Sequence, residues 1–205
     1  MVLNGSGKTL SAVQFVEQLT YDYPKAILVT NTEMNNINFL TQVIEYKGLD
    51  SLLEIENGEN GVIYFIDEIH LEMNSLDSKN LSMDTIVELS QQRKQRKLIV
   101  GTSQVFMRMA KPLREQVKNV IVCKNWFRLL QLNRYIDNEF SYEKDGKLCS
   151  DRSKLFLWFH SPRLYNSYDT YAKMKRYKKE WSSGNEKQNI YTNDFSGLVV
   201  REGER

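Results

Sequence analysis

The chain has 205 residues, of which 41% are hydrophobic and 26% are charged. This composition is that of a soluble globular domain with a sizeable core, and three prolines exclude a proline-rich or collagen-like chain. Two cysteines, Cys123 and Cys149, exclude a disulfide framework and a four-cysteine zinc site. The net charge of +2 neither indicates nor excludes nucleic acid binding.

No secretory or membrane segment is expected. Residues 1–8 lack a basic stretch followed by a long apolar run. The strongest apolar run, residues 62–66, is far shorter than the roughly 20 residues that span a bilayer. We therefore expect a chain without a transmembrane segment, located in the cytoplasm, which is the host cytoplasm if the chain is viral.

Short apolar runs alternate with helical patterns along the first 124 residues. Helices are predicted where apolar residues recur every three or four positions, at residues 9–20, 36–46 and 83–92. Strands are predicted at residues 26–30, 62–66, 98–102 and 117–123. These runs are apolar on both faces, which is typical of central parallel strands. The order predicts an α/β fold, a mainly parallel sheet flanked by helices.

The chain changes character after residue 124. Residues 125–181 are rich in aromatic and basic side chains, and we expect them to form a small extension that continues the domain. A hairpin turn is predicted at residues 143–147, a strand at 155–159 and a basic helix at 168–181. Residues 182–205 have the composition of a mobile tail.

The sharpest motif is Gly5-Ser6-Gly7-Lys8-Thr9, directly before a predicted helix. Glycines let backbone N–H groups point at phosphate oxygens, and the helix N-terminus adds partial positive charge. Lys8 is expected to reach the β- and γ-phosphates of ATP, and the Thr9 hydroxyl to ligate Mg²⁺. The sequence thus predicts the end of a Walker A loop. The loop's first glycine and preceding strand are missing, which leaves a chance match in a surface loop as the alternative.

A second motif follows the apolar strand at residues 62–66, which ends in Asp67 and Glu68. This is a Walker B pattern, in which Asp67 holds the magnesium and Glu68 orients or deprotonates the attacking water. The alternative is a buried strand that ends in solvated acids. Gln104 follows the strand at residues 98–102, where its amide is placed to hydrogen-bond the water or the γ-phosphate.

Taken together, these motifs resemble the FtsK–HerA superfamily of P-loop ATPases, and within it the zonular occludens toxin-like branch of phage morphogenesis proteins. The resemblance covers residues 4–124, with a tyrosine-rich stretch at 165–171 also similar. It implies a P-loop NTPase fold, ATP and Mg²⁺ as cofactors, and a homo-oligomeric ring. The branch usually carries a transmembrane helix after the ATPase domain, and this chain lacks one.

The resemblance also implies a catalytic arginine supplied to a neighbouring subunit. The family often has this arginine eleven residues before the glutamine, which here is Arg93. Such a side chain stabilises charge in the transition state. Arg96 and Arg114 are rivals for the role, and a solvated surface position is the alternative for each.

The function expected from these residues is an ATP-hydrolysing motor that moves DNA during packaging or serves virion assembly, and the resemblance implies that it is phage-encoded. DNA and viral capsid or assembly proteins are its expected partners. The basic and aromatic residues 173–181 suit DNA phosphates, although a solvated helix face explains them as well. Two alternatives remain: a nucleotide-binding assembly or regulatory factor without robust hydrolysis, and a membrane-associated filamentous phage extrusion factor.

Overall fold

The computed structural model describes residues 5–71, 87, 90–92, 94–127, 129–144 and 147–168. Several sequence-based expectations lie outside these residues. They are most of the helix at 83–92, the helix at 168–181 beyond Tyr168, and the tail at 182–205. The division of the chain at residues 124 and 181 stays a prediction.

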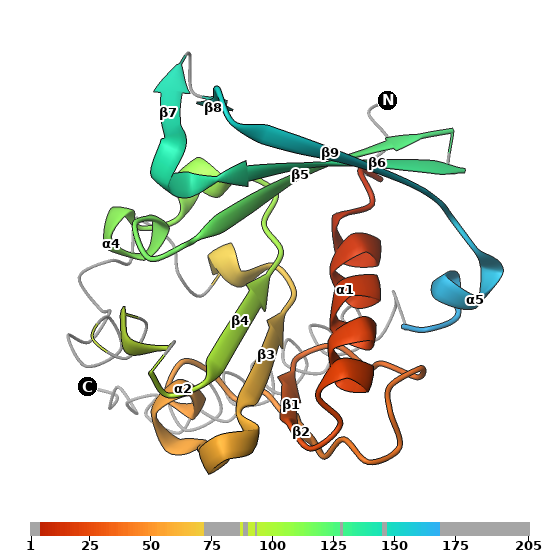
Figure 1. Cartoon of the computed structure of the whole chain (residues 1–205), viewed down its shortest axis with the longest axis vertical. Helices are drawn as coiled ribbons and strands as arrows, with labels where there is room; N and C mark the ends of the chain where they lie inside the picture. Colours follow the sequence, from red (N-terminus) through yellow and green to blue (C-terminus); the bar gives the residue numbers. More distant parts are fainter. Residues whose placement is uncertain are drawn as a thin grey trace, which may run out of the picture. The chain divides into compact units, whose positions relative to one another are not determined.

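Four parallel strands form the central sheet: β1 (Ile27–Thr30), β2 (Val43–Glu45), β3 (Val62–Ile66) and β4 (Lys97–Gly101). Their order is β2-β1-β3-β4, as Figure 1 shows in part. Thr30 lies opposite Phe65, and Ile66 lies opposite Gly101. The residues that follow β1, β3 and β4 therefore emerge at one edge of the sheet. The strands predicted at 26–30, 62–66 and 98–102 are confirmed.

Both faces of this sheet are buried at its central strand β3, as the apolar run predicts. All five residues of β3 are buried. Ile63 and Phe65 face the predicted helix, which runs as α1 from Lys8 to Asp22. Tyr64 belongs to a second buried cluster, which includes Leu113 and other residues from the far side of the sheet. The parallel α/β core is thus confirmed, with α1 packed against one face of the sheet (Figure 1).

The helix predicted at residues 36–46 is wrong. The segment is irregular up to residue 42, and residues Val43–Glu45 form β2, which pairs with β1. The side chain of Asn38 accepts a hydrogen bond from the Leu40 N–H (3.0 Å), and its carbonyl accepts one from the Thr41 N–H (3.0 Å). This turn satisfies the backbone without a helix, as asparagine often does. Phe39, one residue of the segment, is 91% exposed.

The parallel strand predicted at residues 117–123 is also corrected. The segment is extended, as β5 (Asn119–Trp126), but it belongs to a separate antiparallel sheet of order β5-β6-β9, with β6 (Leu130–Asp137) and β9 (Ser153–Phe159). Exposed and half-buried residues alternate along much of β5, which is typical of a sheet with one solvated face. β9 confirms the strand predicted at 155–159.

Short elements complete the described fold. β7 (Ser141–Lys144) and β8 (Lys147–Ser150) pair antiparallel, which confirms the hairpin predicted at 143–147. Three short α-helices lie in the described part of the chain: α2 (Ser51–Glu54), α4 (Lys111–Arg114) and α5 (Pro162–Tyr165). Among the described residues, no helix is both long and apolar enough to cross a membrane.

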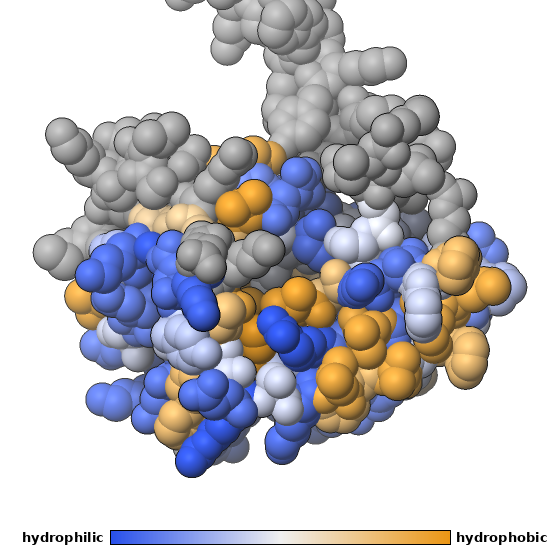
Figure 2. All heavy atoms as spheres, turned by 90° about the horizontal axis from the view of Figure 1, so that it is seen from above, coloured by the Kyte–Doolittle hydropathy of each residue, from blue (hydrophilic) through white to orange (hydrophobic). Residues whose placement is uncertain are grey.

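The antiparallel sheet lies over the amino end of α1 and the ends of β3 and β4 (Figure 1). Its large exposed apolar residues, with those of the β5–β6 turn, are Val122, Trp126, Phe127, Leu129, Leu155, Phe156, Leu157 and Phe159. Figure 2, seen from above, shows apolar side chains gathered on one part of this side of the molecule. The sheet therefore both covers the predicted phosphate loop and presents apolar surface to its surroundings.

Candidate nucleotide site

The predicted phosphate loop leads directly into α1. Gly7 caps the helix with φ of +74°, a left-handed conformation that glycine adopts without strain. Its carbonyl accepts the Ser11 N–H at 2.9 Å, which starts the helical hydrogen bonding. The Lys8 ammonium donates to the Ser6 hydroxyl at 3.0 Å. A helix N-terminus with a lysine folded over the preceding loop is suited to binding an anion such as phosphate.

The predicted Walker A threonine and Walker B aspartate meet at this end of α1. The Thr9 hydroxyl donates to Asp67 Oδ1 at 3.0 Å, although the two residues are 58 positions apart. Hydroxyl and carboxylate oxygens are hard ligands of the kind that Mg²⁺ prefers. The pair therefore fits the cation that the sequence motifs predict. The described residues contain no cluster of three or more histidine, cysteine or acidic side chains that could hold a metal by themselves.

Two residues that the sequence analysis did not single out hold Asp67 in place. The Thr102 hydroxyl donates to Asp67 Oδ1 at 2.6 Å. The Asn31 side chain binds the Asp67 backbone twice, accepting from its N–H at 2.8 Å and donating to its carbonyl at 3.0 Å. Asn31 and Thr102 directly follow β1 and β4, as Asp67 follows β3. The shared strand edge was the signal that could have identified them.

Glu68 is held in an unusual backbone conformation next to Asp67. Its φ is +56°, which costs a residue other than glycine about 1–3 kcal/mol. Its N–H donates to the Thr102 hydroxyl at 2.9 Å. Gln104 Nε2 donates to Glu68 Oε1 at 3.3 Å, and His70 Nδ1 lies 3.2 Å from Oε2. Backbone strain of this kind is typical of functional sites. In this conformation the Glu68 carboxylate lies between the side chains of Gln104 and His70.

His70 was not predicted as a site residue. Its side chain is 14% exposed and that of Glu68 is 19% exposed, so water screens the pair only weakly. The structure thus brings Gln104 and His70 beside Glu68, while the predicted contact of Gln104 with the attacking water or the γ-phosphate stays a prediction.

The two arginine candidates that the structure describes do not join this cluster. Arg93 lies outside the described residues. Arg96 precedes β4, at the opposite end of that strand from the Asp67 edge, and donates to the Glu59 carbonyl at 2.6 Å. Arg114, in α4, contacts the Met107 sulfur at 3.2 Å. The role of an arginine supplied to a neighbouring subunit stays a prediction.

The antiparallel sheet adds a buried polar chain above the phosphate loop. Gln131 of β6 is fully buried, and its amide donates to the Ser6 carbonyl and to Asn133 Oδ1, at 3.0 and 3.1 Å. Its Oε1 lies 3.1 Å from His160 Nε2. An amide oxygen only accepts, so His160 carries its proton on Nε2. Asn133 also accepts from the Ser11 hydroxyl at 3.2 Å.

The pKa values of two groups near the site, Cys123 and Tyr168, are raised. Burial raises the pKa of the Cys123 thiol from its ordinary value of 9.0, against lesser opposing effects of a hydrogen bond with Ser11 and the charge of Lys8. Burial, followed by the nearby charge of Asp67, raises the pKa of the Tyr168 hydroxyl. Cys123 is therefore a protonated thiol at neutral pH, and Tyr168 is a neutral neighbour of the Asp67 carboxylate.

Comparison with known proteins bears on the fold. Neither the protein-family models nor the curated protein sequences give a match. Among solved structures, the chain is similar to the N-terminal domain of zonular occludens toxin from Neisseria meningitidis, with a TM-score of 0.57 and 15% sequence identity. The similarity covers 81% of this chain and 94% of that domain. At this identity the similarity establishes the fold alone: an α/β fold of the P-loop NTPase type, like that of the toxin domain.

Proposed function

We propose that the chain is a Mg²⁺-dependent ATPase whose hydrolysis drives a phage-type motor. The observation that carries the proposal is the hydrogen bond between Thr9 and Asp67, because it joins the two predicted motifs at one point. Glu68 and Gln104 lie beside it, in mutual contact. A chance Gly-Lys-Thr in a surface loop would not meet a strand-end aspartate in this way.

Each residue has a distinct task in this proposal. The phosphate loop and Lys8 bind the β- and γ-phosphates, and Thr9 and Asp67 hold Mg²⁺. The bound cation supplies positive charge that offsets the charge developing on the phosphates. Glu68 accepts a proton from the attacking water, and Gln104 orients that water by hydrogen bonding.

The second part of the proposal concerns what ATP hydrolysis is used for. We propose DNA movement during packaging or virion assembly by a homo-oligomeric ring, with capsid or assembly proteins as further partners. The exposed apolar residues of the antiparallel sheet support subunit contacts of some kind. The fold of the zonular occludens toxin domain supports an association with phages only by analogy.

One observation favours the alternative of a nucleotide-binding factor with little hydrolysis. Both oxygens of Glu68 already have neighbours, Gln104 Nε2 at 3.3 Å and His70 Nδ1 at 3.2 Å. Oε1 accepts from Gln104, and Oε2 is buried and forms no hydrogen bond with the described residues, so the carboxylate must move before it accepts a proton from water. The alternative therefore predicts ATP binding without turnover.

Phosphate release and ATP binding by the purified chain separate these functions. We expect Mg²⁺-dependent turnover that rises with added duplex DNA. Glu68→Gln should lower kcat by about 10²–10⁴-fold with little change in the Kd for ATP, because general base catalysis contributes a factor of that size. Glu115→Gln is the matched control, since Glu115 is an exposed residue whose side chain pairs with Lys111 at 3.9 Å.

The outcomes distinguish the proposals. ATP binding without turnover in the unsubstituted chain favours the regulatory or assembly factor. Turnover that DNA does not change removes the support for a DNA motor and leaves the ATPase. An absence of ATP binding, or equal turnover in Glu68→Gln and the unsubstituted chain, would refute the assigned site.

A further inference from the structure

One edge of the antiparallel sheet is open. β9 is an outer strand of that sheet and, among the described residues, pairs with β6 on one side only. Its seven residues include no proline and a single charged side chain, Lys154. Proteins usually protect such an edge with prolines, several charges or a covering segment, because an unpaired strand edge binds other strands. The sequence of β9 gives little of this protection.

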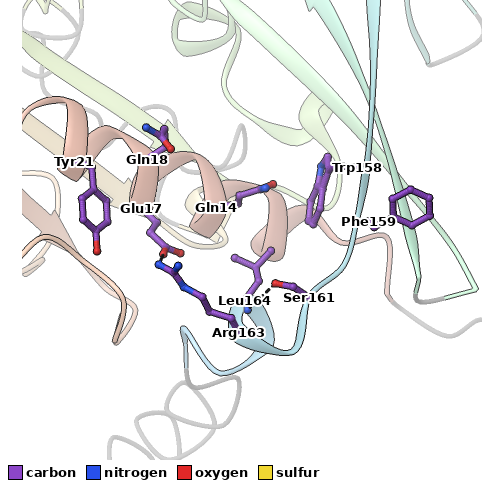
Figure 3. A pocket seen from close by; sticks show the side chains of 9 residues that line it. All are labelled: Gln14, Glu17, Gln18, Tyr21, Trp158, Phe159, Ser161, Arg163 and Leu164. Carbon is purple, nitrogen blue, oxygen red and sulfur yellow. Dashed lines mark hydrogen bonds and ion pairs between the residues drawn. The ribbon is translucent and has the colours of Figure 1, made fainter.

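The middle of β9 is exposed on both faces of the sheet. Successive side chains of a strand point to opposite faces, and Figure 3 shows Trp158 and Phe159 on opposite sides of β9. Leu155, Phe156 and Leu157 are nevertheless all between 52% and 64% exposed. β5, the other edge strand, has half-buried residues along its length. β9 is therefore the more accessible edge of the sheet.

One hydrogen bond shows which backbone groups of β9 point outward. His160 donates its N–H to the Leu129 carbonyl at 2.8 Å, directly beyond the pairing of β6 with β9. In an antiparallel pair, residues whose N–H and C=O face the partner strand alternate with residues whose groups point away. The even-numbered residues of β9 therefore face β6, and Leu155 and Leu157 point their backbone groups away from the sheet. No strand in the described part of the chain pairs with them.

The order of residues in β9 suits pairing with a second copy of the same strand. Its centre reads Leu155-Phe156-Leu157, which is the same in both directions. In an antiparallel pairing about a two-fold axis at Phe156, Leu155 of each copy lies opposite Leu157 of the other. The backbone groups that point outward then meet in hydrogen-bonded pairs. Phe156 lies opposite its own counterpart in a non-hydrogen-bonded pair, where side chains approach most closely.

Charge and ring contacts favour the same register. Lys154 lies opposite Trp158 of the second copy, and the two Lys154 residues are about 13 Å apart along the strands. This distance exceeds the Debye length of about 8 Å at physiological salt, so their repulsion is screened. Phe156 already contacts Tyr135 of β6 edge to face, with ring centroids 4.8 Å apart. The pairing would extend this contact into a row of four rings across the two copies.

We propose that the outer edge of β9 is a self-association site, through which two copies of this chain form a two-fold dimer with one continuous six-stranded sheet. The inference goes beyond the proposed function and requires no nucleotide. A two-fold contact uses the same surface on both copies and closes on itself. It therefore joins copies in pairs, and a ring would need a second contact surface.

Sedimentation velocity over a dilution series measures the pairing of the full chain without nucleotide. We expect a reversible equilibrium between monomer and dimer. Leu157→Pro removes an N–H that would bond the second copy and leaves the N–H groups that face β6 in place. Leu157→Ala is the matched control, because it shortens the same side chain and keeps that N–H. The dimer Kd should be about tenfold or more higher in Leu157→Pro than in Leu157→Ala, since symmetry removes two hydrogen bonds at once.

Cross-linking tests the register and does not depend on the proline variant. Phe156→Cys places two introduced thiols opposite each other, with Cα atoms about 4.5 Å apart, which a disulfide spans. Oxidised glutathione should convert most of this variant into a disulfide-linked dimer. Leu155→Cys is the matched control, because the two copies of that residue are about 7 Å apart along the strands in addition to the gap between them. Both variants carry Cys123→Ser and Cys149→Ser, which remove the native thiols.

The outcomes distinguish the possible occupants of this edge. Cross-linking of Phe156→Cys but not of Leu155→Cys, with a weaker dimer in Leu157→Pro, supports the two-fold contact. If circular dichroism shows that Leu157→Pro is unfolded, the cross-linking decides alone. A chain that is monomeric throughout the dilution series overturns the inference and leaves the edge to an extended segment of another protein.

Self-association through another surface is the remaining outcome. Dimers or larger assemblies that persist unchanged in Leu157→Pro, with equal cross-linking of Phe156→Cys and Leu155→Cys, would overturn the inference. None of these measurements involves ATP. A failure of the β9 contact therefore leaves the proposed ATPase function standing, and a failure to bind ATP leaves the β9 contact standing.

Discussion

Gly7 is the position where a single methyl group should be most disruptive. A Cβ atom built on Gly7 would overlap Oε1 of Gln131 and would lie 2.7 Å from its Cδ. Gln131 is fully buried and bound to three partners, so it cannot move aside freely. Gly7 also has φ of +74°, where an alanine is strained. Gly7→Ala therefore combines a backbone cost with a steric one.

The two costs have different sizes and origins. The left-handed backbone costs about 1–2 kcal/mol in alanine. Displacing Gln131 loses hydrogen bonds to Ser6, Asn133 and His160, each worth about 0.5–1.5 kcal/mol net. We expect Gly7→Ala to lower the free energy of unfolding by about 3–5 kcal/mol. With Gln131→Ala already present, the steric part disappears and about 1–2 kcal/mol remains.

Urea unfolding of the four chains in this double-mutant cycle measures the coupling. Gly5→Ala is the control, because a Cβ at Gly5 meets nothing within 4 Å and should change stability little. An equal loss from Gly7→Ala with and without Gln131 would refute the contact between β6 and the phosphate loop. A loss no larger than that of Gly5→Ala would refute the backbone conformation as well.

Two further predictions concern the Thr9–Asp67 pair and the half-buried Cys123 thiol. Thr9→Ala should remove most of the gain in ATP affinity that Mg²⁺ gives, about tenfold or more, while Thr9→Ser retains it; ATP titrations with and without Mg²⁺ measure this. Cys123 should react with iodoacetamide more slowly in the folded chain than in urea at pH 8, because burial raises its pKa and suppresses the thiolate. The pKa of this thiol is higher in the folded chain than in the unfolded chain. Its contribution to the free energy of unfolding is therefore complete below pH 9.0 and is lost as pH rises through the folded pKa. In a pH series, the free energy of unfolding of Cys123→Ala should fall less steeply at high pH than that of the unsubstituted chain.

The parallel core could be predicted because its signals are local. The runs at residues 26–30, 62–66 and 98–102 are apolar on both faces, which is the pattern of buried parallel strands. The run at 117–123 has nearly the same pattern, yet its pairing is set by β6, whose alternating polar residues gave no clear strand signal. Pairing between strands depends on partners elsewhere in the chain, and periodicity alone does not identify them.

The predicted site shows the same division between local and distant causes. Lys8, Thr9, Asp67 and Glu68 could be identified because each stands at a fixed place beside a helix start or strand end. The contacts that hold Asp67 in place could not be predicted in this way. Asn31 and Thr102 bind Asp67 only because β1 and β4 end level with β3, a fact of register that the pairing of the strands determines.

Gly7 has two independent reasons to be glycine in this fold. The proposed phosphate binding calls for a backbone without a side chain, so that N–H groups approach the anion. The close approach of the buried Gln131 side chain calls for the same residue on packing grounds alone. The predicted phosphate loop is therefore held in shape from the side of the antiparallel sheet without any ligand. Gln131→Ala in an otherwise unsubstituted chain would remove these contacts with the loop. Its effect on the Kd for ATP can then be compared with its effect on the free energy of unfolding. The difference between the two effects would show how much of the loop's ordering the ligand must provide when it binds.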